Sequence, residues 1–397
     1  MTRPLDGIRV LELGQLMAGP MAGTLLSYFG AEVIKVEKPD GGDPVRSWRV
    51  VEDGTSLWWR SLARNKRLVA IDLRTDDGRD LVRRLAGRVD VVIENFRPGT
   101  LERWGLAPDD LRRENPGLIV ARVSGFGQTG PYRDRRGFAS VCEAVGGLRF
   151  VTGHPGETPV RSNLSLGDSL AAWQTAIGIL LSLLARERVT DGRGQDVDSA
   201  IYEAVYGMME AAPTEADRLG VVREPSGTTI TGVVPTDAYP TADGRHVVIG
   251  ANGDSIFRRL MRAAGRDDLA EDERLATNDR RVRHQAEIDD AIGAWTRTLP
   301  VGAVLDALEE AGVPAGPINS TADMLDDEHF EARGLLEPVA LGDETIRLPA
   351  MGPKLSETPG RSDVVGGDVG RDTDAVLGDI GVDAAARTDL RERGVIL

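Results

Sequence analysis

The chain has 397 residues, of which 41% are hydrophobic and 28% charged, a balance typical of a folded soluble enzyme and not of a disordered chain. This length allows two domains or one large one. Acidic residues (63) outnumber basic residues (48), and the formal net charge of -15 disfavours nucleic acids and anionic membrane surfaces as partners.

The first two hundred residues alternate short β-branched runs with helical patterns. Strands are predicted at Ile8–Leu13, Glu32–Glu37, Leu68–Leu73, Val89–Glu94 and Leu118–Ser124, and helices at Pro20–Phe29, Gly78–Ala86, Leu101–Trp104, Pro108–Glu114, Ser169–Arg188 and Val197–Glu210. Strands separated by helices in this way predict an α/β fold with a parallel, doubly wound sheet and helices on both of its faces.

The composition changes near Pro213–Pro235, which has few apolar residues and several Gly, Pro and Thr, as linkers do. A β-hairpin with its turn at Ala242–Gly244 follows, then helical patterns over Asp254–Gly312 and again in Thr373–Leu397. We therefore expect a discontinuous large Rossmann-like domain, residues 1–224 and 326–397, and a smaller α+β domain at 225–325.

Several common enzyme signatures are missing. The turn GQLMAG at 14–19 has Leu16 where the dinucleotide fingerprint needs its second glycine, and neither a GxxxxGK[ST] loop nor a GxSxG elbow occurs. The four histidines lack HExxH-type spacing, so no metal site is predicted.

Compartment and membrane signals are also weak. Cys142 is the single cysteine, so no internal disulfide can form. The longest apolar stretch, Leu170–Ala185, is interrupted by polar residues, and we expect it to be too short to span a bilayer. The N-terminal segment leads into the first predicted strand without a leader pattern, so a cytoplasmic protein is expected.

The segment SLGDS at 165–169 stands directly before the long apolar helix. One interpretation is a helix start, with Ser165 as the cap and the Asp168 carboxylate favoured by the helix dipole. A second is chemical: a carboxylate beside backbone amides, with Gly167 leaving space, can act as an oxygen nucleophile toward a carbonyl carbon. The two interpretations are compatible.

Cationic residues gather near the ends of the predicted strands: Lys38, Arg64, Lys66, Arg67, Arg74, Arg97 and Arg103. Ligands of open α/β sheets bind outside the carboxyl ends of the strands, so a basic ring there in an acidic protein favours a polyanionic ligand. The alternative is that these are ordinary solvated loop residues.

Long motifs in a fixed order resemble those of the family III CoA-transferases, the CaiB/BaiF family, over essentially the whole chain. They include GIRVLELGQLMAGP, VVIENFRPGTLERWGL, SGFGQTGPY, SLGDS and DGRGQDVDSA. The resemblance implies an intertwined homodimer, with a Rossmann-like domain that binds CoA and a small domain that closes over the acyl group. It implies no permanently bound cofactor, with the CoA thioester and a small carboxylic acid as substrates.

In that family the aspartate of the GD motif is the nucleophile, which falls on Asp168 here. The family's CoA contacts would fall on Met17, Ala18, Lys38, Arg74, Asn95, Phe96, Arg97, Arg103, Gly137 and Phe138. The implied chemistry runs through an acyl–aspartyl anhydride and an aspartyl-CoA thioester, with backbone amides stabilising each oxyanion. Water must be excluded, and the glycine-rich segment Gly250–Gly253 is a candidate for that closure.

Two alternatives stay open. The α-methylacyl-CoA racemases of the same fold have a histidine where this chain has Phe138, after Gly137, which disfavours racemisation. A second departure from the pattern is Asp372, where many members have histidine. Since some CoA-transferases are built from two similar chains, this chain could also be one subunit of a heteromer.

One stretch of the sequence and two arginines bear on the choice of substrate. The stretch 140–161 looks most like branches that use succinyl-CoA and small dicarboxylic or hydroxy-dicarboxylic acids. Arg149 or Arg161 could pair with the distal carboxylate of such an acid, although either could equally be a surface or structural arginine.

Overall fold

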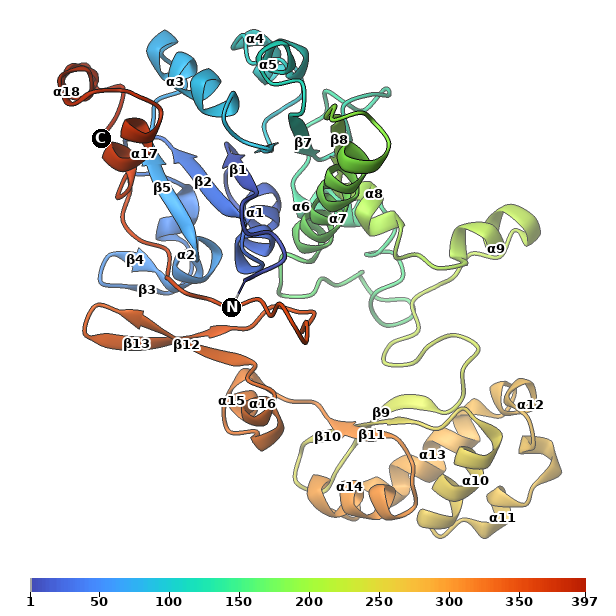
Figure 1. The fold of residues 1–397 in the computed structure, drawn as a ribbon. Helices are drawn as coiled ribbons and strands as arrows, with labels where there is room; N and C mark the ends of the chain where they lie inside the picture. Colours follow the sequence, from blue (N-terminus) through green and yellow to red (C-terminus); the bar gives the residue numbers. More distant parts are fainter. Residues whose placement is uncertain (1) are drawn as a thin grey trace. The chain divides into compact units, whose positions relative to one another are not determined.

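The computed structural model describes residues 2–397, which form two compact units (Figure 1). Unit 1 contains the described residues up to Leu148, together with Ser162–Glu210 and Glu331–Leu397. Unit 2 contains Arg149–Arg161 and Ala211–Phe330. The chain thus passes between the units at 210/211 and 330/331, whereas the sequence predicts domain boundaries at 224/225 and 325/326. No pattern in the sequence indicates that residues 149–161 pack with unit 2.

A parallel sheet forms the centre of unit 1. Within residues 2–397 it has six strands in the order β5-β2-β1-β6-β7-β8. Their bounds are β1 (Arg9–Glu12), β2 (Glu32–Glu37), β5 (Lys66–Ala70), β6 (Val91–Glu94), β7 (Ile119–Ser124) and β8 (Asp196–Ala200). The expected α/β fold with a parallel sheet is confirmed. The strand order reverses between β1 and β6, the topological switch point where open α/β sheets bind ligands.

Helices cover both faces of this sheet, because successive strand residues alternate between two apolar cores. Leu11 of β1 belongs to one core with Leu81 and Val376, whereas Val10 belongs to the other with Leu25 and Ile179. The first core is covered by α3 (Asp76–Ala86), α4 (Thr100–Arg103), α5 (Pro108–Glu114), α17 (Thr373–Asp379) and α18 (Ala384–Glu392). The second is covered by α1 (Ala18–Tyr28) and α7 (Leu166–Arg188).

Smaller elements complete unit 1. They are η1 (Pro44–Ser47), β3 (Val51–Glu52), β4 (Thr55–Ser56), α2 (Leu57–Leu62), α6 (Ala139–Val145), α8 (Ile201–Tyr206) and the hairpin of β12 (Leu336–Leu341) and β13 (Glu344–Pro349). The helix predicted over Val197–Glu210 is wrong in its first part. Residues Asp196–Ala200 pair with β7 as the edge strand β8, and only then does the chain turn into α8, because strand pairing overrides the local helical pattern.

Helix α7 corrects a second expectation, since its 23 residues are long and apolar enough, by length and composition, to cross a membrane. About 33% of its most apolar window is buried inside the chain. Ala172, Ala176 and Ile179 pack in the core with α1 and the sheet, while Ile177 and Leu181 are exposed. The helix therefore buries one apolar side in its own unit and leaves another uncovered by it.

Unit 2 is built on an antiparallel sheet in the order β11-β10-β9, and the predicted hairpin is confirmed as β9 and β10. Its strands are β9 (Thr236–Pro240), β10 (His246–Gly250) and β11 (Ala315–Pro317). Its helices are α9 (Ala212–Leu219), α10 (Asp254–Ala263), α11 (Asp267–Ala270), η2 (Glu273–Leu275), α12 (Asn278–Val282), α13 (Gln285–Thr296), α14 (Val301–Glu310) and α15 (Thr321–Leu325), and α16 (Glu328–Ala332) spans the boundary with unit 1. Phe257, Ile292 and Val304 lie in its apolar core.

Candidate active site

The segments that follow β1 and β6 meet at the switch point. The backbone N–H of Gln15 donates to Asn95 Oδ1 at 2.8 Å, and Asn95 Nδ2 donates to the Gln15 carbonyl oxygen at 2.7 Å. A Cβ atom at Gly14 would lie 2.9 Å from Asn95 Oδ1, so the close approach requires glycine there. The structure thus joins the predicted residue Asn95 to the turn that leads to Met17 and Ala18.

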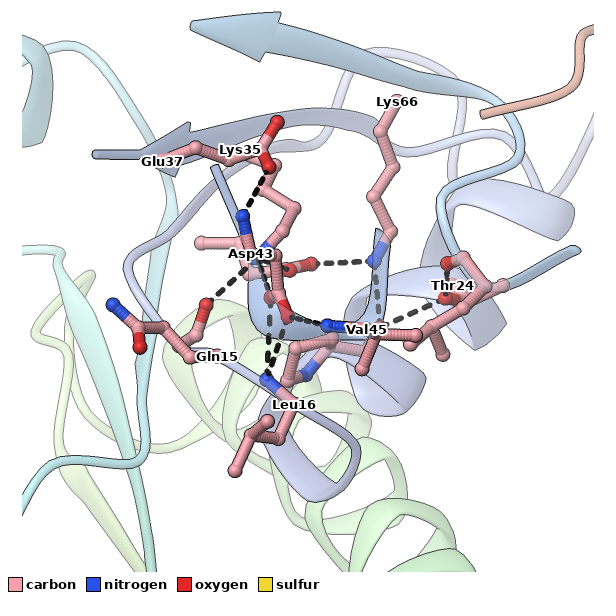
Figure 2. Close-up of polar contacts among 12 residues, drawn as sticks. Gln15, Leu16, Thr24, Lys35, Glu37, Asp43, Val45 and Lys66 are labelled. Atoms are coloured by element: carbon pink, nitrogen blue, oxygen red, sulfur yellow. Dashed lines mark hydrogen bonds and ion pairs between the residues drawn. The ribbon is translucent and has the colours of Figure 1, made fainter. Parts of the chain in front are cut away.

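A buried group of charged side chains supports this turn (Figure 2). Lys35 Nζ lies 3.1 Å from Glu12 Oε1 and 3.1 Å from Asp43 Oδ2, while Lys66 Nζ lies 2.8 Å from Glu12 Oε2. The contact with Glu12 Oε1 is an ion pair only, because that oxygen accepts no hydrogen bond. The Glu37 carboxylate pairs with Arg46 at 2.7 Å. We call Glu12, Lys35, Asp43 and Lys66 the buried charge cluster.

Two lysines share the buried charge cluster, and their pKa values move apart. Burial lowers the pKa of Lys66 to about 8, with Glu12 as the nearest opposing charge and Lys35 adding repulsion. Lys35 also loses hydration, but Glu12, Asp43 and Glu37 together raise its pKa above the ordinary value. Neither lysine is accessible to a ligand, so their role is structural.

The predicted basic ring is therefore only partly correct. Lys66 is buried, and so is Arg64, which donates to the carbonyl oxygens of Ser61 and Pro349. Arg64 precedes β5 and Lys66 is its first residue, so both lie at the amino end of the strand and do not belong to a ligand-binding edge. Arg67, the second residue of the same strand, pairs with Glu32 and Asp379.

The other predicted cations follow the carboxyl ends of their strands. Lys38 follows β2, Arg97 follows β6, and both are exposed. Arg103, the last residue of α4, is exposed as well. Arg74 follows β5 with 80% of its side chain exposed, and the neighbouring Asp72 carboxylate binds it at 2.7 Å and raises its pKa. Lys38, Arg74 and Arg97 therefore lie at the carboxyl edge of the sheet, and Arg103 lies in the helix that follows β6.

The loop from β7 to α6 brings the predicted Gly137 against Gly125. A Cβ atom at Gly137 would lie 3.0 Å from Phe126 Cε2 and 3.1 Å from Cys142 Sγ, so a side chain there would require both neighbours to shift. Phe138 comes next, precedes α6 as its N-cap residue and is 69% exposed.

One apolar cluster connects this loop to the starts of two helices. It contains Ala18 at the start of α1, Phe126 in the loop after β7, and Ala171 in the first turns of α7. Asp168 stands one turn before Ala171 and is half-buried. The structure therefore gathers Ala18, Gly137 and the turn that carries Asp168 in one region of unit 1.

The residue before Asp168 is held by an acid that sequence analysis did not single out. Glu143, 2% exposed, accepts a hydrogen bond from the Gly167 N–H at 3.0 Å, and a Cβ atom at Gly167 would lie 3.1 Å from Glu143 Cγ. A glutamate inside the short apolar helix α6 was the available signal. Ser165 occupies the N-cap position of α7 and Asp168 lies in its first turn, as predicted, but the Ser165 side chain makes no capping hydrogen bond.

Burial and the negative charges of Asp168 and Glu143 together raise the pKa of Cys142 to about 11. The thiol therefore stays protonated at neutral pH, and Cys142 Sγ donates to the Gly125 carbonyl oxygen at 3.3 Å. A protonated thiol is a weak nucleophile, so Cys142 is disfavoured for nucleophilic chemistry in this region. Within residues 2–397, no three His, Cys, Asp or Glu side chains form a group that could hold a metal ion.

Met17 lines a pocket of about 300 Å³ in unit 1. Its walls come from α1, α2, α7 and the segment after β13, and they include Trp58, Trp173 and Met351. Arg64 also lines it, with its guanidinium hydrogen-bonded to backbone carbonyl oxygens. The pocket is mostly apolar and adjoins the turn between β1 and α1.

Comparisons with known proteins agree with one another. The family model described as CoA-transferase family III matches residues 5–373. A succinyl-CoA–D-citramalate CoA-transferase from Chloroflexus aurantiacus is 50% identical over 383 residues, covering 95% of this chain and 94% of that protein. The alpha subunit of a succinyl-CoA–L-malate CoA-transferase from the same species is 41% identical, covering 99% of this chain and 92% of that protein.

Solved structures give the same answer. A CAIB/BAIF family protein from Brucella suis superposes with a TM-score of 0.85 at 32% identity, covering 96% of this chain and 100% of that one. A hypothetical protein from Mycobacterium tuberculosis gives a TM-score of 0.82, also at 32% identity, covering 94% of this chain and 99% of that one. The chain is thus a CoA-transferase and belongs to CoA-transferase family III.

Proposed function

We propose that this enzyme moves CoA from succinyl-CoA to a small dicarboxylic acid, and that Asp168 carries the acyl group and then CoA during transfer. The observation that carries the proposal is the position of Asp168, half-buried in the first turn of α7 beside the glycine that Glu143 holds. The relatives that act on D-citramalate and L-malate support a hydroxy-dicarboxylate as the acceptor.

The chemistry needs four carboxylate or thiolate attacks and no net proton transfer. An Asp168 oxygen attacks the thioester carbonyl carbon, the C–S bond breaks, and CoA leaves as thiolate. The thiolate attacks the aspartyl carbonyl carbon of the resulting anhydride and releases succinate, leaving an aspartyl-CoA thioester. The acceptor carboxylate then attacks this thioester, and the returning thiolate cleaves the second anhydride to give the product and free Asp168. Each attack develops an oxyanion that backbone amides can stabilise.

The remaining predicted site residues are proposed as CoA contacts in two groups. Lys38, Arg74 and Arg97 are exposed at the carboxyl edge of the sheet and Arg103 is exposed at the end of α4, so all four cations can pair with phosphates. Met17, Ala18, Asn95, Phe96, Gly137 and Phe138 are proposed to contact the rest of the molecule toward Asp168. The shared apolar cluster of Ala18 and Ala171 supports this assignment.

A panel of succinyl-, formyl-, acetyl- and branched-chain acyl-CoA tests the donor. With hydroxylamine present, we expect succinyl-CoA to give a hydroxamate on the peptide that contains Asp168, detected by peptide mass spectrometry, because hydroxylamine attacks both the anhydride and the thioester. The other donors should give none. Absence of any adduct with succinyl-CoA, while another donor reacts, would contradict the proposed donor.

The same purified protein also tests the two alternatives, a subunit of a heteromer and a racemase. Relatives that are alpha and beta subunits, at 41% and 39% identity, make a heteromer the second candidate. Transfer by the purified single chain argues for an autonomous enzyme, whereas activity that appears only with a second similar chain argues for a heteromer. Proton exchange from D₂O into a 2-methylacyl-CoA, without hydroxamate formation, would instead indicate a racemase.

We also propose that a second copy of the chain covers the exposed side of α7. Ile177, Leu180, Leu181 and Leu184 recur at helical spacing and are 42–60% exposed, which is unusual for so many large apolar side chains on one helix. Changing Ile177 and Leu181 together to lysine should convert a dimer to a monomer in light scattering, because two charges would have to be buried. A wild-type chain that is already monomeric would contradict the proposal.

A further inference from the structure

The turn between β1 and α1 has a backbone conformation that its sequence does not favour. Leu16 has a φ of +64°, in the left-handed region. A residue with a Cβ atom is strained there, whereas glycine is not. Met17 and Ala18 follow directly, so the direction of the chain at Leu16 decides where both residues lie. Something other than the local sequence must hold this conformation.

Two side chains hold it from opposite sides of the switch point (Figure 2 labels Asp43, Gln15 and Leu16). Both carboxylate oxygens of Asp43, which follows β2, lie 3.2 Å from the Leu16 N–H nitrogen that donates to them. Asn95, which follows β6, accepts from the Gln15 N–H and donates to the Gln15 carbonyl oxygen. Two successive peptide units are thereby fixed.

The buried charge cluster holds Asp43 itself in place. Lys35 Nζ lies 3.1 Å from the Asp43 carboxylate and donates to the Gly14 carbonyl oxygen at 2.7 Å. The Val45 N–H donates to Asp43 Oδ1 at 3.0 Å. Asp43 is 1% exposed and Lys35 is fully buried, so neither can contact a ligand directly. Asp43 and Lys35 can therefore affect ligand binding only by fixing the conformation of the turn.

We propose that Asp43 and Asn95 are positioning residues, which lock Gln15 and Leu16 in the left-handed turn and so place Met17 and Ala18 for CoA. The inference rests on the proposed function, because it assumes that this turn contacts CoA. In the protein without CoA, Asn95 then holds the Gln15 backbone in place, whether or not its side chain also contacts CoA.

The experiment measures the Kd of free coenzyme A by calorimetry, and the KM of succinyl-CoA and of the acceptor acid. Asp43→Asn removes the charge, and Asn95→Asp keeps the acceptor oxygen but removes the donor to the Gln15 carbonyl oxygen. We expect each to raise the Kd of CoA about tenfold, the effect of losing one charge-assisted or well-placed hydrogen bond. The KM of the acceptor should change less than about twofold.

A glycine at position 16 separates positioning from a general loss of structure. Because glycine adopts a positive φ without strain, the hydrogen bonds that Asp43 and Asn95 make to the turn are less necessary in the Leu16→Gly background. There, Asp43→Asn should raise the Kd of CoA no more than about twofold. Ser27→Ala is the matched control, since Ser27 lies at the other end of α1 and its buried hydroxyl contacts the carbonyl oxygens of Thr24 and Arg64.

The outcomes are distinct. Unchanged CoA affinity in folded Asp43→Asn and Asn95→Asp, with a wild type that binds CoA, overturns the positioning role and leaves the proposed function intact. The positioning role is also overturned if Asp43→Asn raises the Kd of CoA equally whether residue 16 is leucine or glycine. If Asp43→Asn does not fold, Asn95→Asp in the two backgrounds decides the same question. A wild type that neither binds CoA nor transfers it overturns the proposed function and this inference together.

Discussion

Replacing Asp168 by alanine is expected to lower the rate of CoA transfer by at least about a thousandfold while the chain stays folded. The proposed reaction has no first step without a carboxylate at this position, and the Cys142 thiol nearby is kept protonated by its raised pKa. Alanine is the best helix former, so the first turn of α7 survives. Transfer from succinyl-CoA is followed by product chromatography, and folding by circular dichroism.

Three further variants make this result specific to the nucleophile. Asp168→Asn keeps the shape and removes the charge, so it should lose as much activity as alanine. Asp168→Glu keeps the nucleophile but displaces it, and an intermediate loss is expected because small displacements are costly in catalysis. Asp110→Ala changes an aspartate in the first turn of α5, where it pairs with Arg113, and should leave transfer unchanged. Full activity of Asp168→Ala would contradict the covalent mechanism.

The sheet was predictable from sequence wherever a strand is buried on both faces. Val10, Leu11, Val92 and Ile93 are completely buried, and such continuous apolar runs define a parallel strand without reference to its partners. The edge strand β8 was not predictable in this way, because Asp196–Ala200 is polar and half-exposed and becomes a strand only by pairing with β7. Long apolar runs carry their own signal, whereas edge strands depend on a neighbour.

The candidate site was predictable where a motif names a residue and not where contacts are long-range. Asp168 follows from the resemblance, and its environment does not. Glu143 reaches Gly167 across 24 residues, and Lys66 reaches Glu12 across 54 residues. In the sequence Lys66 appears as one more cation near a strand end, although it lies in the core. The spacing of residues along a chain predicts local structure. It does not predict which carboxylate, distant in sequence, will neutralise a buried lysine.

Replacing Glu12 by glutamine is expected to lower the free energy of unfolding of unit 1 by about 3–5 kcal/mol, the usual cost of breaking a buried ion pair from one side. Glu12 is completely buried between Lys35 and Lys66, at 3.1 and 2.8 Å from their Nζ atoms. Glutamine keeps the volume but removes the charge, and its NH₂ group faces one of two ammonium groups that also donate. The shift in the midpoint of urea denaturation measures the loss.

A matched control and a second-site change test this cause. Glu32→Gln alters another glutamate of the same sheet, but its pair with Arg67 is 30–40% exposed, so a loss of no more than about 1 kcal/mol is expected. Adding Lys66→Met to Glu12→Gln removes the ammonium that the first change leaves unpaired, and the loss should fall by at least about 1 kcal/mol relative to the sum of the two single changes. Strict additivity would mean that Glu12 and Lys66 do not stabilise each other, and the loss in Glu12→Gln would then come from packing instead of charge. Coupling between them would show that the Glu12 and Lys66 side chains stabilise each other in this core.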